Sequence, residues 1–391
     1  MTRATHPSRF RLRDAAVVAA FLALLLVAGR LNGSSLQSRE PAPDRTPPSP
    51  TTAQAPPRAL PRTLPVVARI TLPSRSGLLQ GGLEDERAVA AAAGAVWVAD
   101  GCAVARVQPR TNKITSRVAI GERDPQDDAC RVLGLSIGPE GSVWVATTTV
   151  LVRADRAGRR IAATLPLAPS GAPAAAAGAI WVPCCWVATS EHANLPLQGW
   201  LLRVDPATDR VTARIPLPGG HPKAVGAGLG GIWVAGYRDR QDRPGGVIEH
   251  APVLWRVDPA TNQVIGSFSP LGSPIALLGS DASPPSVLAS HGAVFMSDPS
   301  TGVVWQVDPH QRRFIGSMAI SQGGPLAAAA GVVWAGGAST LVALTGPNAG
   351  GDGSRLLDPL GRWITGLAAS ADTLWVATSD ALYRIDSRRL G

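Results

Sequence analysis

A short segment centred on an aromatic residue recurs seven times along the chain, and this repeat limits the possible folds more than any other feature. The copies read GAVWVAD, GSVWVAT, GAIWVPC, GGIWVAG, GAVFMSD, GVVWAGG and DTLWVAT, with centres at Trp97, Trp144, Trp181, Trp233, Phe295, Trp334 and Trp375. The centres are 47, 37, 52, 62, 39 and 41 residues apart, close to the roughly 40–50 residues of a four-stranded propeller blade. The units are short, β-branched and rich in turn residues, so strands suit them better than solenoid helices. The repeat predicts an all-β fold, a seven-bladed β-propeller.

Each unit is expected to hold four short strands. The first is small and apolar, as in 88–94, 224–230 and 325–331, and suits the crowded centre of a ring. The second carries the aromatic centre, whose ring we expect to pack between neighbouring blades. A turn joins the third and fourth strands, most clearly in LLRVDPATDRVTARIPL and LWRVDPATNQVIGSFSP. Its aspartates, Asp205 and Asp258, can accept backbone hydrogen bonds two residues on, so we assign them to the turn and not to catalysis.

The last unit reaches the C-terminus without a fourth strand, and a matching strand stands at the start of the domain. Residues 66–73 (VVARITLP) resemble 211–218 (VTARIPLP) almost residue for residue. An N-terminal strand that completes the last blade would close the ring and remove two exposed edges. One propeller domain over 66–391 is therefore expected. In the sixth unit a Gly-rich insertion replaces the turn, which leaves a six-bladed ring as the alternative.

The N-terminus has the pattern of a targeting segment. Residues 1–13 carry four arginines, and an uncharged apolar run follows from Ala15 to Gly29. We predict a basic cytoplasmic segment over 1–13 and one hydrophobic helix over 14–31, with the propeller outside the cell. Because no A-x-A cleavage site follows the run, we expect an uncleaved single-pass anchor in a bacterial cell membrane. The run is also short enough for a signal peptide, so secretion after cleavage is the alternative.

Residues 32–65 are rich in Pro, Ser and Thr and are expected to form a disordered linker. The net charge of +9 raises the question of a nucleic-acid partner. However, residues 1–65 hold nine of the 37 basic and three of the 28 acidic residues, which leaves the domain a net charge of only +3. A nearly balanced domain lacks the concentrated basic surface that binds a phosphate backbone. We expect no nucleic-acid partner, and a membrane contact through the N-terminal helix.

The repeat also resembles known families. RVDPATDRVTARIPLPGG followed by HPKAVGAGLGGIWVAG is similar to the YVTN-type repeat β-propellers, and the blade cores resemble those of the streptogramin B (virginiamycin B) lyase-like propellers. The resemblance covers roughly residues 66–391. The lyase resemblance implies a metal-dependent lyase or hydrolase with a metal held among His and Glu. Blades of that family usually read LWFTE, whereas this chain has WVAD, WVAT, WVPC, WVAG and FMSD in those places. The departure argues against lyase activity.

In an up-and-down blade, the connections after strands two and four emerge on the same face. The two longest connections after strand two are expected at 186–199 and 237–252, and each contains a Glu-His pair. The candidate ligand- or partner-binding residues on this face are Glu191, His192, His221, Tyr237, Arg238, Glu249 and His250. The histidines and glutamates among them could bind a divalent metal or act as general acid and base, but polar loops are also the ordinary surface of a propeller. We assign no metal site and no catalytic residue, and the cofactor is unknown.

Four cysteines remain, and an extracytoplasmic compartment would favour disulfides. Cys102 and Cys130 are expected on the face just described, within blade one, and their bridge is preferred among the three possible pairings. Cys184 and Cys185 are adjacent, so their Cα atoms are about 3.8 Å apart, which would strain a bridge between them. Strained bridges of this kind occur in quinone-dependent propeller dehydrogenases, which this chain resembles only in architecture.

The sequence contains no P-loop, nucleophile elbow or HExxH helix. It predicts an extracytoplasmic, membrane-tethered propeller that presents a loop-rich face to a protein or a small ligand. The competing hypothesis is a metal-dependent lyase or hydrolase of the streptogramin B lyase type.

Overall fold

The computed structural model describes most of the predicted propeller domain. The described residues are 64–72, 87–92, 94–121, 131–184, 199–241, 248–270, 285–299, 301–320, 324–337, 339–344, 355–356 and 363–390. They belong to one compact unit, Arg58–Gly391. The predicted basic segment, hydrophobic helix and nearly all of the linker lie outside the described residues. Within the described part of the chain, no helix is long and apolar enough to cross a bilayer.

The sheets follow the sequence repeat, because each repeat folds into one antiparallel sheet of four strands. Blade one consists of β2 (Val89–Ala92), β3 (Ala95–Ala99), β4 (Ala103–Gln108) and β5 (Lys113–Ala119). Blade two consists of β6 (Val132–Ile137), β7 (Val143–Thr147), β8 (Leu151–Ala154) and β9 (Ile161–Leu165). Blade three consists of β10 (Ala174–Ala176), β11 (Ala179–Cys184), β12 (Gly199–Asp205) and β13 (Arg210–Leu217). Blade four consists of β14 (Gly220–Gly228), β15 (Gly231–Gln241), β16 (Ile248–Asp258) and β17 (Gln263–Phe268). Blade five consists of β18 (Ser286–Ser290), β19 (Ala293–Asp298), β20 (Val303–Asp308) and β21 (Arg313–Ala319). Blade six consists of β22 (Leu326–Ala329), β23 (Val332–Gly337), β24 (Thr340–Leu344) and β25 (Arg355–Leu356). Blade seven consists of β26 (Ile364–Ser370), β27 (Thr373–Thr378), β28 (Ala381–Asp386) and β1 (Val66–Thr71). The 3₁₀ turn η2 (Ser387–Arg389) follows β28.

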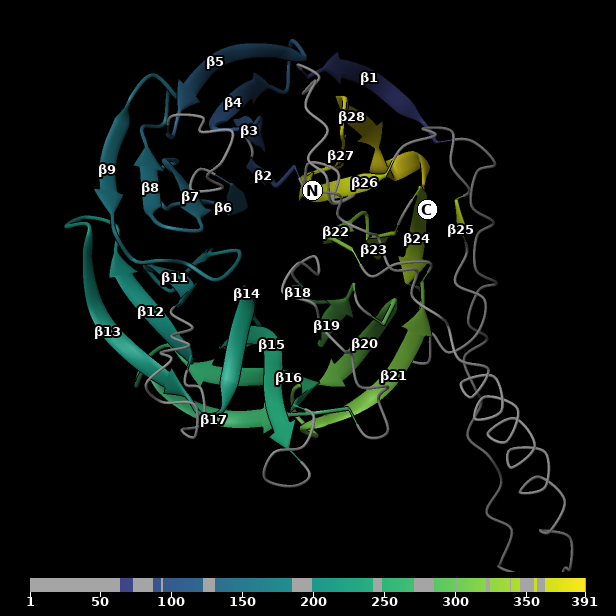
Figure 1. The fold of residues 1–391 in the computed structure, drawn as a ribbon. Helices are drawn as coiled ribbons and strands as arrows, with labels where there is room; N and C mark the ends of the chain where they lie inside the picture. Colours follow the sequence, from purple (N-terminus) through teal and green to yellow (C-terminus); the bar gives the residue numbers. More distant parts are fainter. Residues whose placement is uncertain are drawn as a thin grey trace, which may run out of the picture. The chain divides into compact units, whose positions relative to one another are not determined.

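The seven sheets form a ring in which the first strand of each blade lies nearest the centre and the fourth strand lies on the rim (Figure 1). The seven-bladed prediction is confirmed, and the six-bladed alternative is wrong. Blade six is complete even though its fourth strand, β25, has only two residues.

The N-terminal strand closes the ring as predicted. β1 pairs antiparallel with β28, with Ile70 opposite Leu382 and Thr71 opposite Ala381. The closed blade leaves no unpaired edge on β28, which would otherwise be open to pairing with another chain.

The aromatic centres pack between blades, which confirms their predicted place in the core. Each of the seven hydrophobic clusters combines residues of two neighbouring blades: Trp97 packs with Val143 and Val145 of blade two, and Trp181 packs with Val234 and Val253 of blade four. The six tryptophan centres are fully buried. Rings of this size dominate core energetics, so the repeat is conserved within the chain for packing.

A second contact joins several blades: an arginine of the third strand lies over the tryptophan of its own blade and reaches the turn of the next blade. The guanidinium of Arg203 is 5.4 Å from the centre of the Trp181 ring. Its Nη1 donates to the carbonyl oxygen of Pro259 at 3.2 Å and to Oδ1 of Asn262 at 3.0 Å. We call this contact an arginine staple. Equivalent staples run from Arg153 to Asp209, from Arg256 to Pro309, and from Arg384 to Pro109 and Asn112.

Candidate functional site

The connections after strands two and four of each blade form one face of the ring, which we call the strand 2–3 face. The connections after strands one and three form the opposite face, which we call the strand 3–4 face. The structure changes the predicted form of the strand 2–3 face in blade four. β15 and β16 have eleven residues each, and their pairing runs without interruption from Ile232 opposite Val257 to Gln241 opposite Ile248. The loop predicted over 237–252 is therefore wrong for 237–241 and 248–252, where continued pairing satisfies the backbone groups. Residues 242–247 lie outside the described residues.

The structure describes only one of the two Glu-His pairs that the sequence suggested as ligand-binding residues. Glu249 and His250 are strand residues of β16, opposite Arg240 and Asp239. The other pair, Glu191 and His192, lies outside the described residues. The proposed ligand-binding role of both pairs stays a prediction.

His221 is also a strand residue and not part of a loop. Only Pro218 and Gly219 separate β13 from β14, so the first strand of blade four begins one residue before His221. His221 pairs with Tyr237 across β14 and β15, and its side chain is buried. Next to Tyr237, Arg238 is partly buried and its guanidinium lies 5.9 Å from the centre of the Trp255 ring.

Tyr237, which the sequence suggested for a partner-binding rim, is only 3% exposed. Its hydroxyl donates to Oδ1 of Asp298 at 2.9 Å, and the other oxygen of Asp298 accepts from Thr301 Oγ1 at 3.0 Å. Because Asp298 ends β19 of blade five, the bond ties the base of the long β15–β16 hairpin to the next blade. Buried phenol groups need such a partner, so Tyr237 holds the hairpin in place.

A buried ion pair that sequence reasoning missed lies where blades one and seven meet. Asp100 bonds Arg87 Nη1 at 3.1 Å and Arg117 Nε at 2.8 Å, and the side chains of Asp100 and Arg87 are each 3% exposed. Arg87 Nε also donates to the carbonyl oxygen of Ser379 in blade seven at 2.9 Å. Asp100 and Asp298 are both the third residue after an aromatic centre. An acid at that position of the repeat was the available signal.

Lys223 is the second feature that the sequence analysis missed. It belongs to β14, the innermost strand of blade four (Figure 1). Burial lowers the pKa of its ammonium by removing water, and the nearby positive charge of Arg131 lowers it further. Arg131 directly precedes β6, the innermost strand of blade two. No hydrogen bond or ion pair reaches the Lys223 ammonium from the described residues.

Backbone contacts explain why blades two and four approach at this point. The amide of Ala172, in the segment that leads into blade three, donates to the carbonyl oxygen of Lys223 at 3.1 Å. On its other side, Ala172 fits against Gly134 of β6, where a β-carbon would lie 2.4 Å from the methyl group of Ala172. One segment therefore bridges the inner strands of both blades and brings two cations together.

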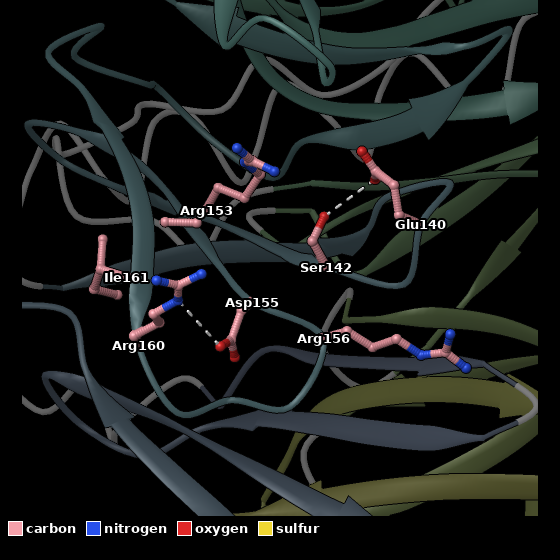
Figure 2. A pocket seen from close by; sticks show the side chains of 8 residues that line it. Glu140, Ser142, Arg153, Asp155, Arg156, Arg160 and Ile161 are labelled. Atoms are coloured by element: carbon pink, nitrogen blue, oxygen red, sulfur yellow. Dashed lines mark hydrogen bonds and ion pairs between the residues drawn. The ribbon is translucent and has the colours of Figure 1, made fainter.

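A cavity of about 420 Å³ lies on the strand 3–4 face, beside the turn that joins β8 to β9 (Figure 2). Its charged groups are largely paired. Arg160 Nε lies 3.7 Å from Asp155 Oδ2, and Arg153 Nη2 lies 2.6 Å from Asp209 Oδ2. Figure 2 shows Arg160 directed toward Asp155, while Arg156 extends away from both.

Within the described part of the chain, no three His, Cys, Asp or Glu side chains lie close enough to hold a metal ion. The two described cysteines, Cys102 and Cys184, are not free thiols. Cys130 and Cys185 lie outside the described residues, so the predicted pairing of Cys102 with Cys130 stays a prediction.

Solved structures with the same fold include virginiamycin B lyase from Staphylococcus aureus. A catalytically inactive form with Quinupristin is 15% identical, with a TM-score of 0.54 over 82% of this chain and 98% of that chain. Hydrazine synthase from Kuenenia stuttgartiensis is 12% identical, with a TM-score of 0.56 over 79% and 99%. A chain of the Mitotic Checkpoint Complex is 11% identical, with a TM-score of 0.57 over 91% and 99%. No protein-family model and no curated protein matches the sequence. These likenesses place the chain in the class of β-propellers, a fold that serves many unrelated functions.

Proposed function

We propose that this protein is an extracytoplasmic, membrane-tethered β-propeller that acts as a binding module, and that its strand 2–3 face takes a protein or small ligand through an acidic group. The observation that carries the proposal is the ammonium of Lys223, which is partly buried, close to Arg131 and without a partner among the described residues.

The energetics of a buried cation support an acidic ligand. An ammonium that has lost water without gaining a counter-charge is unfavourable, and a carboxylate or phosphate would restore the balance. The long β15–β16 hairpin belongs to the same blade as Lys223 and pairs directly with β14. Tyr237 and Asp298 fix its base, so the hairpin is a pre-positioned surface that costs little ordering on binding.

The test is a thermal-shift screen of the full chain in a nonionic detergent. The probes are acetate, citrate, inorganic phosphate and an oligo-glutamate peptide, and the proteins are the wild type and Lys223→Met. At least one acidic probe should raise the Tm of the wild type by mass action and leave the variant unchanged. Lys113→Met, which removes the chain's other lysine, is the matched control and should respond as the wild type does. Equal shifts in all three proteins would contradict the proposal, and turnover of quinupristin by the wild type would favour the lyase hypothesis.

The membrane tether rests on the apolar run from Ala15 to Gly29 and the arginines on its cytoplasmic side. An intact mass that includes residues 1–31, together with retention in membranes washed at alkaline pH, is the expected result. A mature chain that begins just after the apolar run would replace the anchor with a cleaved signal.

The disulfide between Cys102 and Cys130 is part of the same proposal, because it requires an oxidising compartment. Peptide mapping without reduction should recover the Cys102 and Cys130 peptides as one linked species. Recovery of Cys102 linked to Cys184 or Cys185 would contradict this pairing.

A further inference from the structure

The junction of blades one and two lacks the arginine staple. Arg106 pairs with Trp97 across β3 and β4, just as Arg203 pairs with Trp181 across β11 and β12. However, Arg106 does not reach the next blade. Its guanidinium donates within blade one, to Thr115 Oγ1 at 3.1 Å and to the carbonyl oxygen of Gly94 at 3.4 Å.

The turn of blade two explains why. Arg159 occupies the turn position that Asp209 holds in blade three and Asn262 holds in blade four, where each accepts the arginine of the preceding blade. Blade five also has an arginine there, Arg312, but its turn still accepts Arg256 through the carbonyl oxygen of Pro309. The turn of blade two differs from that turn in its backbone too, because its residue with a positive φ is Gly158, one place earlier than in the stapled turns. Arg106 therefore meets both a like charge in place of a side-chain acceptor and a turn of different backbone conformation. Two guanidinium groups repel each other, and neither can accept a hydrogen bond.

The backbone of this turn also lies unusually close to blade one. Gly158 has a φ of 67°, and a β-carbon on it would lie 2.7 Å from Cη2 of Trp97. Ser116 Oγ of blade one donates to the carbonyl oxygen of Ala157 at 2.7 Å. Gly158 and Ser116 thus hold the turn close against blade one, and the arginines on either side of the turn line a hollow.

That hollow is a cavity of about 360 Å³ lined by Arg106, Thr115, Arg156, Ala157 and Arg159. It contains three arginines and no carboxylate. No hydrogen bond or ion pair reaches the guanidinium of Arg156 or Arg159 from the described residues. In the neighbouring cavity of Figure 2, by contrast, Arg153 and Arg160 are paired with aspartates. Arg156 belongs to both cavities and points away from the paired groups (Figure 2).

We propose that the cavity formed by Arg106, Arg156 and Arg159 at the junction of blades one and two is a binding site for a phosphate-class oxyanion. The ligand oxygens take the place of the acceptor that the turn provides at the stapled junctions. A guanidinium group can bind two phosphate oxygens through a bidentate pair of hydrogen bonds, and such charge-assisted bonds are stronger than hydrogen bonds between neutral groups. The site lies on the strand 3–4 face and is independent of the binding proposed for Lys223. The phosphate group belongs either to a soluble phosphorylated molecule or to the headgroup of an anionic lipid.

The test is a calorimetric titration of the full chain, in a nonionic detergent at low salt, with inorganic pyrophosphate. One site per chain is expected. Arg159→Asn should weaken binding at least about tenfold, the effect of losing a hydrogen bond from a charged group. Arg210→Ala removes an exposed arginine at the start of β13 in blade three and should leave the affinity unchanged. Equal weakening by both variants, or no binding to the wild type, would overturn the proposal. If Arg159→Asn does not fold, Arg156→Ala replaces it, because that side chain is exposed.

A second arm separates the two sources of the phosphate group. The full chain is placed in nanodiscs of phosphatidylcholine alone or with phosphatidylglycerol, and the titration is repeated. Weaker apparent binding of pyrophosphate in the anionic nanodiscs identifies a lipid headgroup as the occupant, provided that Arg159→Asn removes the difference. Equal affinity in both nanodiscs identifies a soluble ligand. A difference between nanodiscs that persists in Arg159→Asn would overturn occupation of this cavity by lipid.

Discussion

The junction of blades three and four and the junction of blades one and two are built from the same repeat, yet one is stapled and the other is open. At the first, Arg203 lies over Trp181 and donates to Pro259 and Asn262 of the next turn. At the second, Arg106 turns back onto its own blade, because the next turn has Arg159 in place of a side-chain acceptor and a different backbone conformation at Gly158. Arg312 holds the same turn position in blade five, yet Arg256 still reaches the carbonyl oxygen of Pro309 there. The side chain and the backbone conformation of the turn therefore decide together whether a junction is stapled.

The largest expected effect is a loss of stability when the buried tryptophan that both junctions share is removed. Trp181→Ala and Trp97→Ala each remove a fully buried ring and should each lower the free energy of unfolding by about 3–5 kcal/mol. Urea denaturation of the full chain measures both. A much smaller loss for Trp97→Ala would show that the difference between the junctions extends into the core.

The next effect separates the junctions. Arg203→Ala removes two hydrogen bonds to the next blade and the contact with Trp181, and should cost about 1–3 kcal/mol. Arg106→Ala removes only contacts within blade one and should cost no more than about 0.5 kcal/mol. Equal losses in urea denaturation would mean that the staple contributes nothing to stability.

These contrasts also show where the sequence was a sufficient guide. The aromatic centres, the alanine-rich inner strands and the closing strand expected over 66–73 were predicted, because each depends on local pattern and on packing that the repeat imposes. The predicted loop was wrong for 237–241 and 248–252, because the polar residues there carry no strand period and the pairing of β15 with β16 is fixed by backbone bonds.

The candidate sites were harder to predict, because they depend on contacts between distant residues. The burial of Tyr237 depends on Asp298, sixty-one residues away in the chain. The proximity of the like charges of Lys223 and Arg131 depends on Ala172, which lies between two inner strands. The sequence did contain one usable signal, namely that ADRAGRR in blade two replaces the DPATN-like turn.

A smaller effect of opposite sign should follow when the acceptor is restored. Arg159→Asn removes a like charge and supplies an acceptor for Arg106, so the free energy of unfolding should rise by about 0.5–1 kcal/mol. A thermal melt of the full chain measures the change. A lower Tm would show that Arg159 supports the turn in a way that its position does not reveal.

The smallest expected effect concerns pH and the turns that accept staples. The amide of Ala260 and the hydroxyl of Thr261 hold the pKa of Asp258 below its usual value. A carboxylate whose pKa is lower in the folded state stabilises the protein above its unfolded pKa of about 3.9, and the contribution is lost as pH falls through the folded value. The stability difference between the wild type and Asp258→Asn should therefore be constant from about pH 5 to 7 and shrink below about pH 4. A difference that grows on acidification would contradict the assignment.

The most direct measurement is a double-mutant cycle on Arg106 and Arg159, read as the free energy of unfolding in urea. In the wild type, Arg106→Ala should cost no more than about 0.5 kcal/mol. In the Arg159→Asn background the same substitution should cost about 1–2 kcal/mol, because Arg106 then has an acceptor across the junction. The same cost for Arg106→Ala in both backgrounds would contradict the account, since the side chain of Arg159 would then contribute nothing to keeping the junction open.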